Sequence, residues 1–261
     1  MCLQSAARSY ARSARMLTAW FTFDTALVWL LPRSDRQGRI RVGFKGRQSV
    51  KHLMEALGVP HTEAGTVMIN GAPGSLGQIA RDEDEIIVWP AVRRPTLPAR
   101  FVLDGHLGRL AAYLRMLGFD TWYRSSCPDE ELARLAGQDR VLISRDRRLL
   151  MRKGILQGYC VRSLKPVEQV HEVLARFDLV AAIVPFRRCI RCNGVLEVVD
   201  KAVIRARLKP LTARYYFDFR RCPDCEQIYW KGSHHEKMIR FIHRLHRRAN
   251  ATSPKGTAEL E

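Results

Sequence analysis

Two pairs of cysteines near the end of the chain have the spacing of a metal site. Cys189 and Cys192 form one Cys-x-x-Cys motif, Cys222 and Cys225 form a second, and 29 residues separate the two motifs. Each motif places two thiolates on one tight turn, so the pair of motifs supplies the four sulfur ligands that structural Zn²⁺ prefers. Paired disulfides and unconnected thiols are the alternatives, and the spacing favours zinc.

Two aspartates follow apolar segments that read as strands. Asp104 comes directly after the run 101–103. Two residues, Ser144 and Arg145, separate the run 141–143 from Asp146. Ligands of an open parallel sheet bind outside the carboxyl ends of its strands, so the two carboxylates converge if these strands are neighbours. Carboxylate oxygens suit Mg²⁺ or Mn²⁺, and such an ion can activate water and stabilise a leaving oxygen, as in metal-assisted nucleases. A third acid, Asp129, opens a predicted helix, where capping explains it as well as metal binding does.

Positive charge is concentrated around the cysteine motifs. The chain has 44 Lys and Arg against 26 Asp and Glu, a formal net charge of +18. An excess of this size is typical of proteins that bind a phosphate backbone, although a solvated basic surface is the alternative. The clustering favours nucleic acid, because the basic residues near the motifs are Arg187, Arg188, Arg191, Arg205, Arg207, Lys209, Lys237, Arg240, Arg244, Arg247 and Arg248.

The elements that must position the acids alternate between strand and helix. We predict strands at 101–103, 121–123, 141–143 and 159–161, and helices at 107–117, 129–136, 147–152 and 167–177. In the first helix, Leu110, Leu114 and Leu117 recur at three- and four-residue spacing, which is the period of a helix with one buried face. This order predicts a mostly parallel sheet with helices on its faces.

A different pattern precedes this region. Strands are predicted at 20–31, 39–45, 67–70 and 86–89, with a helix at 50–57, and this order is typical of a β-grasp. Sulfur carriers share that fold but act through a free Gly-Gly carboxyl terminus. Here the chain continues through Pro90 into a proline-rich segment, so the sulfur-carrier interpretation is not favoured.

Composition sets the domain organisation and the compartment. With 261 residues and 46% hydrophobic residues, the chain can form several globular domains. Apolar stretches fall short of the roughly 20 residues of a membrane span, no secretory signal is recognised, and the cysteine count of seven is odd, so we expect a cytoplasmic protein with no membrane association. The predicted order is a basic tail at 1–16, a β-grasp domain at 17–91, a linker at 92–99, a sheet domain at 100–184, a zinc ribbon with a basic terminal helix at 185–248, and a tail at 249–261.

Seven short segments between residues 100 and 240 resemble the Mut-seven C-terminal ribonuclease family, a group of PIN-like nucleases. They are DGHLGRL at 104–110, LRMLGFD at 114–120, DEEL at 129–132, SRDR at 144–147, CIRCNG at 189–194, CPDC at 222–225 and YWKGSH at 229–234. The stretch 49–89 resembles the ubiquitin-like domain found in front of such ribonuclease domains.

The resemblance implies an α/β fold: a PIN-like parallel-sheet domain, preceded by a β-grasp ubiquitin-like domain and followed by a zinc ribbon. It also implies hydrolysis of RNA phosphodiester bonds, with Asp104, Asp129 and Asp146 as catalytic acids and with Asp104 and Asp146 holding Mg²⁺ or Mn²⁺. A fourth acid is not obvious; the candidates are Asp120, Glu130 and Glu131. Ser144 stands where the family commonly has Thr, a change that keeps the hydroxyl and that we expect to be neutral.

Further residues are candidates for RNA binding. On the first helix, Arg109 and Arg115 could face phosphate, although solvated helix positions explain them equally well. Near the terminal helix, a capping box formed by Ser233 and Glu236 marks a helix start that could bind phosphate. The full set of candidates is Arg109, Arg115, Tyr229, Trp230, Lys231, Ser233 and His234.

Two other functions stay open. One is a non-catalytic protein that binds tRNA or rRNA through its basic zinc ribbon. The other is an adaptor whose β-grasp domain recruits a protein partner. A cysteine-nucleophile enzyme is not predicted, because Cys2, Cys127 and Cys160 have no histidine and acid in a recognisable relation to them.

Overall fold

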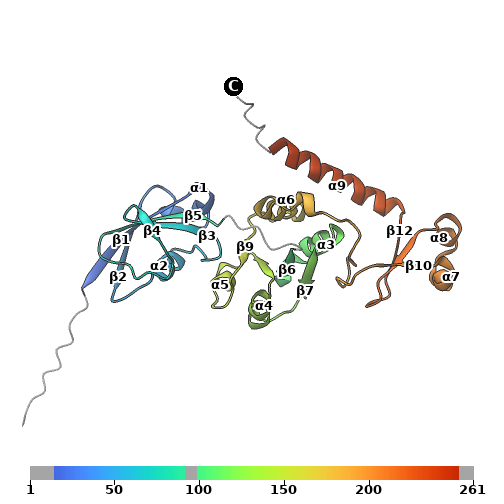
Figure 1. Cartoon of the computed structure of the whole chain (residues 1–261), viewed down its shortest axis with the longest axis horizontal. Helices are drawn as coiled ribbons and strands as arrows, with labels where there is room; N and C mark the ends of the chain where they lie inside the picture. The colour runs from blue at the N-terminus through green and yellow to red at the C-terminus, as the bar shows by residue number, and fades with distance from the viewer. Residues whose placement is uncertain (1–14, 92–98, 253–261) are drawn as a thin grey trace, which may run out of the picture. The chain divides into compact units, whose positions relative to one another are not determined.

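The computed structural model describes residues 15–91 and 99–252 of the chain (Figure 1). Two units are distinguished, Met1–Ala91 and Val92–Glu261. Most of the predicted tails and linker therefore falls outside the described residues. No helix in the described ranges is both long enough and apolar enough to cross a membrane.

The first unit has the predicted β-grasp fold. Its sheet has the order β2-β1-β5-β3-β4, with β5 in the centre, and β1 runs parallel to β5 and antiparallel to β2. The helix α2 (Val50–Ala56) begins after Ser49, whose hydroxyl accepts a hydrogen bond from the backbone N–H of His52 at 3.2 Å. The strands are β1 (Met16–Phe23), β2 (Ile40–Lys45), β3 (Ala64–Ile69), β4 (Ala72–Gly74) and β5 (Asp84–Pro90).

The strand predicted at 20–31 is wrong in its second half. β1 ends at Phe23, and a short helix α1 (Thr25–Val28) and a 3-10 turn η1 (Arg33–Asp35) follow. Asp24 causes the change, because its carboxylate accepts a hydrogen bond from the backbone N–H of Ala26 at 2.8 Å and so caps α1.

The second unit contains the predicted parallel sheet. Four strands pair in the order β7-β6-β8-β9, and all of these pairings are parallel. They are β6 (Arg100–Leu103), β7 (Asp120–Tyr123), β8 (Val141–Ser144) and β9 (Gly158–Cys160). Because β7 lies on one side of β6 and β8 on the other, the chain reverses direction across the sheet between β6 and β8. Ligands of such sheets bind at this reversal point.

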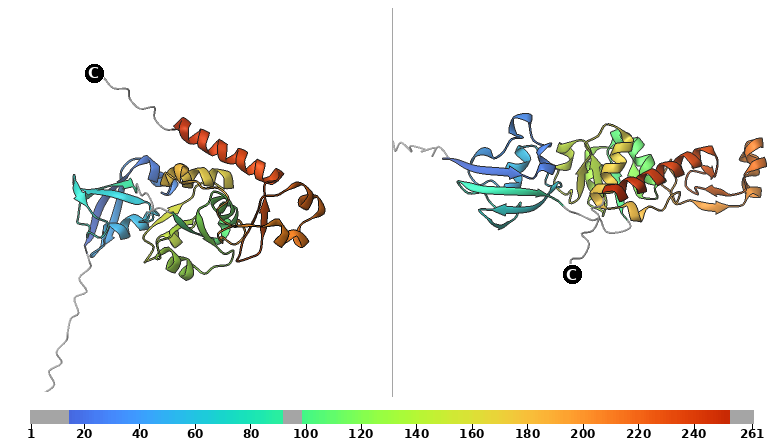
Figure 2. Two further views of the ribbon diagram at one scale, coloured as in Figure 1. Left: turned by 45° about the vertical axis from the view of Figure 1, so that its right-hand side comes forward. Right: turned by 90° about the horizontal axis from the view of Figure 1, so that it is seen from above.

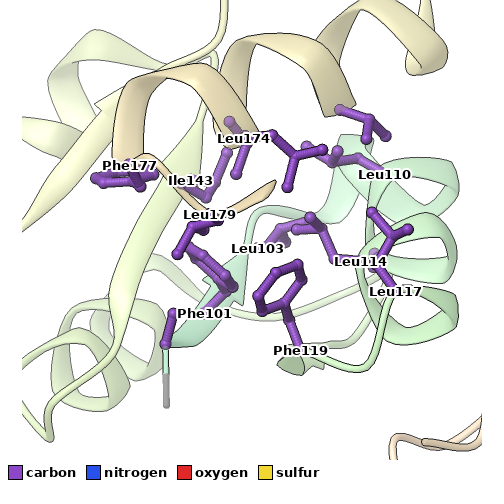
Figure 3. Packing of buried hydrophobic residues seen from close by; sticks show 14 of the residues in the cluster. Phe101, Leu103, Leu110, Leu114, Leu117, Phe119, Ile143, Leu174, Phe177 and Leu179 are labelled. Carbon is purple, nitrogen blue, oxygen red and sulfur yellow. The ribbon is translucent and has the colours of Figure 1, made fainter. Parts of the chain in front are cut away.

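Helices cover both faces of this sheet, as Figure 1 shows for α6 and α4. Leu110 and Leu114 of α3 meet Phe101 of β6 and Leu174 of α6 in the core (Figure 3). The helical elements are η2 (Gly105–Leu107), α3 (Gly108–Met116), α4 (Asp129–Ala136), α5 (Arg147–Leu150), α6 (Pro166–Phe177) and η3 (Val180–Ala182).

The terminal helix α9 (Ser233–Thr252) completes the same core. Phe241, Ile242 and Leu245 are buried in it, and the ring centroid of Phe241 lies 5.1 Å from that of Tyr113 on α3. In Figure 2, α9 runs beside α6. The sequence placed this helix wholly with the ribbon at 185–248, whereas its apolar face packs on the sheet domain.

The ribbon is a three-stranded antiparallel sheet of β10 (Glu197–Val199), β11 (Phe219–Arg221) and β12 (Ile228–Trp230). The long segment between the cysteine motifs forms an insert of α7 (Lys201–Ile204), η4 (Arg205–Arg207) and α8 (Pro210–Tyr215). Ile204 of this insert packs with Phe219 and Ile228 in a small separate core. The helices of this long segment therefore cover one face of the ribbon.

Candidate active site and metal centre

Asp104 and Asp146 lie at the carboxyl ends of the adjacent strands β6 and β8. Leu103 stands opposite Ile143 in the ladder, and the backbone N–H of Asp104 donates to the carbonyl of Ile143 at 3.1 Å. The hydroxyl of Ser144 donates to Oδ2 of Asp104 at 2.8 Å and accepts from the backbone N–H of Asp146 at 2.8 Å. Ser144 is fully buried, so one hydroxyl links both acids.

Each of these acids keeps one carboxylate oxygen available. Oδ1 of Asp146 caps α5 by accepting from the backbone N–H groups of Arg148 at 2.8 Å and Leu149 at 3.3 Å. Within the described residues, Oδ1 of Asp104 and Oδ2 of Asp146 have no hydrogen-bond partner. Mg²⁺ typically binds through one or two carboxylates and keeps several waters, so the donor set fits such an ion.

Asp129 is not gathered with the other two acids. It is the first residue of α4, and Pro128 rather than Asp129 is the N-cap, so the capping interpretation is wrong. Its carboxylate pairs with Arg152 at 3.4 Å, and Arg152 also reaches Glu130 at 2.5 Å. In the part of the chain that the structure describes, the four cysteines are the only group of three or more His, Cys, Asp or Glu placed to hold an ion.

The candidates for a fourth acid are all paired with arginine. Glu130 binds Arg152, and both oxygens of Glu131 accept from Arg134, at 2.8 and 2.9 Å. Asp120 is the first residue of β7, so it lies at the amino ends of the parallel strands, whereas Asp104 lies at their carboxyl ends. Asp120 accepts hydrogen bonds from Arg140 at 2.8 and 3.2 Å. Burial alone would raise the pKa of Asp120, but its hydrogen bonds to Arg140 and Asn193 lower it.

Exposed cations surround the acid pair. Arg145 separates Ser144 from Asp146, and Arg147 and Arg148 begin α5 beside it. Arg109 is exposed in the first turn of α3, which agrees equally with a phosphate contact and with a solvated helix position. Asp146 therefore has exposed arginines on both sides of it in the chain.

Arg115 does not face solvent, and the prediction that it binds RNA is corrected. Its side chain is buried, with the residue 5% exposed. The guanidinium donates to the carbonyls of Thr121 at 2.9 Å, Ile190 at 3.2 Å and Arg191 at 2.9 Å. Burial lowers the pKa of Arg115. Its function is to join α3 and β7 to the first cysteine motif. The helical period carried a signal for this position, since Arg115 follows Ala111 by four residues and so continues the buried face.

The four cysteines form a site that fits structural zinc. Sγ of Cys189 lies 3.5 Å from that of Cys225, and Sγ of Cys192 lies 3.3 Å from that of Cys222. All four sulfurs lie within 4.8 Å of one another. A tetrahedral site with Zn–S bonds of about 2.3 Å separates its sulfurs by about 3.8 Å, so this set matches Zn²⁺.

Backbone turns hold the two cysteine motifs together. The N–H of Cys189 donates to the carbonyl of Gly194 at 2.7 Å, and the N–H of Cys222 donates to that of Gln227 at 3.0 Å. Gly194 is required because a Cβ there would come within 2.8 Å of Sγ of Cys222. The two turns can approach each other only if this residue has no side chain.

Tyr229 is part of the zinc site. Its hydroxyl lies 3.1 Å from Sγ of Cys189 and accepts from the backbone N–H of Ile190 at 3.1 Å, so its own hydrogen is directed to the sulfur. Burial alone would raise the pKa of Cys189, but hydrogen bonds from Tyr229 and from the backbone of Cys192 help to lower it to about 7. The predicted base-stacking residue thus stabilises a zinc ligand.

The remaining RNA-binding candidates are exposed near the start of α9. Trp230 is 40% exposed, and Lys231, Ser233 and His234 are also exposed. Lys231 pairs with Asp218 at 3.0 Å. His234 and its neighbour His235 lie outside the group of zinc ligands, as predicted. His235 stacks on Phe186, with ring centroids 4.5 Å apart.

The asparagine that follows the first cysteine motif ties the zinc site to the sheet. Asn193 accepts from the backbone N–H of Thr121 at 2.8 Å and donates to Oδ1 of Asp120 at 2.8 Å. Arg188 reaches the same carboxylate at 3.5 Å. The sequence offered no reason to single out Asn193, although an asparagine in a left-handed conformation, here with φ of 79°, is common after a tight turn.

Comparisons with known proteins agree with both units. A family model described as Mut7-C RNAse domain matches residues 99–242, and one described as Mut7-C ubiquitin matches residues 16–95. No curated protein and no solved structure matches the chain. The first match takes in the parallel sheet, the zinc ribbon and the first half of α9.

Proposed function

Because the chain belongs to the Mut7-C RNAse domain family, we propose that it is a metal-dependent ribonuclease that hydrolyses RNA phosphodiester bonds at Asp104 and Asp146. The observation that carries this proposal is the Ser144 hydroxyl, which links the two acids at the ends of β6 and β8. A buried hydroxyl shared by two carboxylate-bearing residues fixes their relative position, as a working site requires.

The chain's own groups divide the work. Oδ1 of Asp104 and Oδ2 of Asp146 would hold Mg²⁺ or Mn²⁺. When bound, such an ion supplies an activated water and stabilises the leaving oxygen. Arg109 and Arg145 are exposed and would attract the phosphate backbone by charge. Asp129 stays a proposed third acid, which Arg152 has to release before it can act.

Lys231, Ser233 and His234 are proposed to contact RNA from the start of α9, where backbone N–H groups and the helix dipole favour an anion. These groups lie in the same unit as the acid pair. Removal of this charge should lower affinity for every RNA sequence alike, because phosphate contacts carry no sequence information.

A second candidate function is RNA binding without catalysis. It is favoured by the separation of Asp129 from Asp104 and Asp146 and by its ion pair with Arg152. One experiment separates the two: labelled single-stranded and structured RNA are incubated with the protein, with and without Mn²⁺ or Mg²⁺, beside the Asp104→Asn variant. Metal-dependent cleavage that is lost in the variant supports the nuclease, and equal binding without cleavage supports the alternative.

A further inference from the structure

The exposed aromatic side chains of the described residues all belong to the zinc ribbon. Tyr215 is 62% exposed, Phe217 is 73% exposed and Trp230 is 40% exposed. Elsewhere in the described ranges, the large hydrophobic side chains that are exposed are not aromatic. Apolar groups gathered on one surface mark a binding site more often than scattered ones do.

Two of these aromatic residues, Phe217 and Trp230, line a hollow of about 330 Å³. The lining includes the apolar side chains of Ile190 and Leu196 and the exposed cations Arg220 and Lys231. A volume of this size falls within the range of about 300–1,000 Å³ that is usual for small-ligand sites. The hollow can therefore hold one flat ring system with its charged substituents outside.

Trp230 is packed against its neighbours before any ligand binds, and Phe217 is contacted by a lysine. Trp230 ends β12, opposite Phe219 in the ladder, and its ring centroid lies 6.4 Å from that of Tyr216. Gly232 packs against it so closely that a Cβ would come within 2.9 Å of Nε1 of Trp230. The ammonium of Lys201 lies 4.1 Å from the ring centroid of Phe217. Ordered rings lose little entropy on stacking.

The charge around the hollow suits a polyanion. Asp218 is the only acid among the described residues that line it, and Lys231 neutralises this acid at 3.0 Å. Between residues 185 and 231 the chain has eleven Lys and Arg against five Asp and Glu. An aromatic hollow with cations at its edge and a net positive surround is complementary to a base attached to a phosphate backbone.

We propose that this hollow binds an unpaired RNA base, so that the RNA taken by the ribbon is single-stranded where it meets Phe217 and Trp230. Bases inside an A-form duplex are stacked on one another and cannot enter an aromatic hollow, whereas bases in loops and single strands can. This inference rests on the proposed function for the identity of the ligand as RNA. It does not depend on cleavage.

The test measures RNA binding by the full-length protein without added Mg²⁺ or Mn²⁺, so that cleavage does not enter. The probes are a fluorescein-labelled oligouridylate, a duplex of matched length, and an oligonucleotide of the same length made of abasic nucleotides, which keeps the phosphates and removes the bases. The variants are Phe217→Ala, Trp230→Ala and Trp230→Phe. Tyr215→Ala is the matched control, because Tyr215 is an exposed aromatic residue of the same insert that does not line the hollow.

Phe217→Ala and Trp230→Ala should each weaken oligouridylate binding by roughly 5- to 150-fold, since stacking on one aromatic side chain is worth about that factor. Trp230→Phe should restore most of the affinity. Tyr215→Ala should bind like the wild type, and the abasic probe should not distinguish any of these proteins. Zinc content and thermal unfolding verify that each variant is folded.

Three results would overturn the proposal: unchanged oligouridylate binding in both alanine variants, an equal loss with the abasic probe, or an equal loss in Tyr215→Ala. These results are separate from the fate of the nuclease assignment. A protein that cuts RNA but binds it equally well after Phe217→Ala and Trp230→Ala keeps the proposed function and loses the base site. A protein that never cuts but needs both rings for binding keeps the base site.

Discussion

The hydroxyl of Ser144 donates a hydrogen bond to Oδ2 of Asp104 over 2.8 Å, and so joins the ends of the two central strands of the parallel sheet. Ser144 also accepts the backbone N–H of Asp146, which means that the position of each acid depends on a residue that binds neither RNA nor metal. Four expected outcomes test this arrangement and the zinc site.

Asp104→Asn should reduce metal-dependent RNA cleavage by well over the roughly 10- to 100-fold that is usual for residues beside a metal ligand. The amide keeps the shape and can still accept from Ser144, but it removes the negative charge. RNA binding should be nearly unchanged. Initial cleavage rates measure the effect, with Asp139→Asn as the control because Asp139 is an exposed loop acid. Full activity in Asp104→Asn would remove Asp104 from the mechanism.

Ser144→Ala should lower cleavage by roughly 10- to 100-fold, because the acids lose the group that orients them. Ser144→Thr keeps the hydroxyl and should retain most of the activity. The maximal rate and the Mn²⁺ concentration at half-maximal activity should both be measured. If alanine and threonine behave alike, the loss reflects packing at this buried position and not the hydrogen bonds.

Arg115→Met should destabilise the second unit by about 1–3 kcal/mol, because one buried and two partly buried carbonyl groups lose their donor. Affinity for RNA should not change. Arg109→Met is the matched variant on the same helix. Its free energy of unfolding should stay within about 0.5 kcal/mol of the wild-type value. The slope of log RNA affinity against log salt concentration should become shallower by about one. Denaturant unfolding and salt titrations measure both, and an exchange of the two phenotypes would contradict the assignment.

Cys222→Ser, or removal of zinc by a chelator, should loosen more than the ribbon. The first cysteine motif is bonded through Arg191 to Arg115 of α3, and Asn193 beside it is bonded to Thr121 of β7. In addition, α9 carries Phe241 and Leu245 into the core of the sheet domain. Amide hydrogen exchange should therefore increase in α3 and α6 as well as in β10 to β12, and the β-grasp unit should be unaffected. Cys127→Ser, outside the zinc site, is the control. Loss of protection confined to residues 187–231 would contradict this coupling.

Much of the fold follows from local patterns. Burial sets the helical spacing of Leu110, Leu114 and Leu117. It also sets the short apolar runs before Asp104 and Asp146. Both patterns can therefore be recognised in the sequence. The four cysteines are equally legible, because zinc demands a fixed number of ligands at a fixed spacing. The strand predicted at 20–31 ends instead at Phe23, because the cap at Asp24 starts a short helix in the apolar run that follows.

Long-range pairings could not be predicted in the same way. The sequence predicts that serine can replace the family's threonine at position 144, since both carry a hydroxyl, but it does not predict that this hydroxyl links Asp104 to Asp146 across the ladder. The arginine on α3 reaches a motif about 75 residues further along the chain, in the bonds from Arg115 to Ile190 and Arg191. Its partners are backbone carbonyl groups, which every residue has, so the residue types at these positions do not predict the hydrogen bonds.

The sheet domain is completed late in synthesis. The strands β6 to β9 and the helices α3 to α6 all precede residue 180 in the chain. The core that they form is nevertheless incomplete until Phe241 and Leu245 of α9 have been added. The ribbon is synthesised after the strands of the sheet domain and before α9. Its first cysteine motif is bonded to α3, and the helix that follows it packs in the core of the sheet domain. Because Phe241 and Leu245 belong to the core of the sheet domain, that core can close only after the ribbon and α9 have both been synthesised.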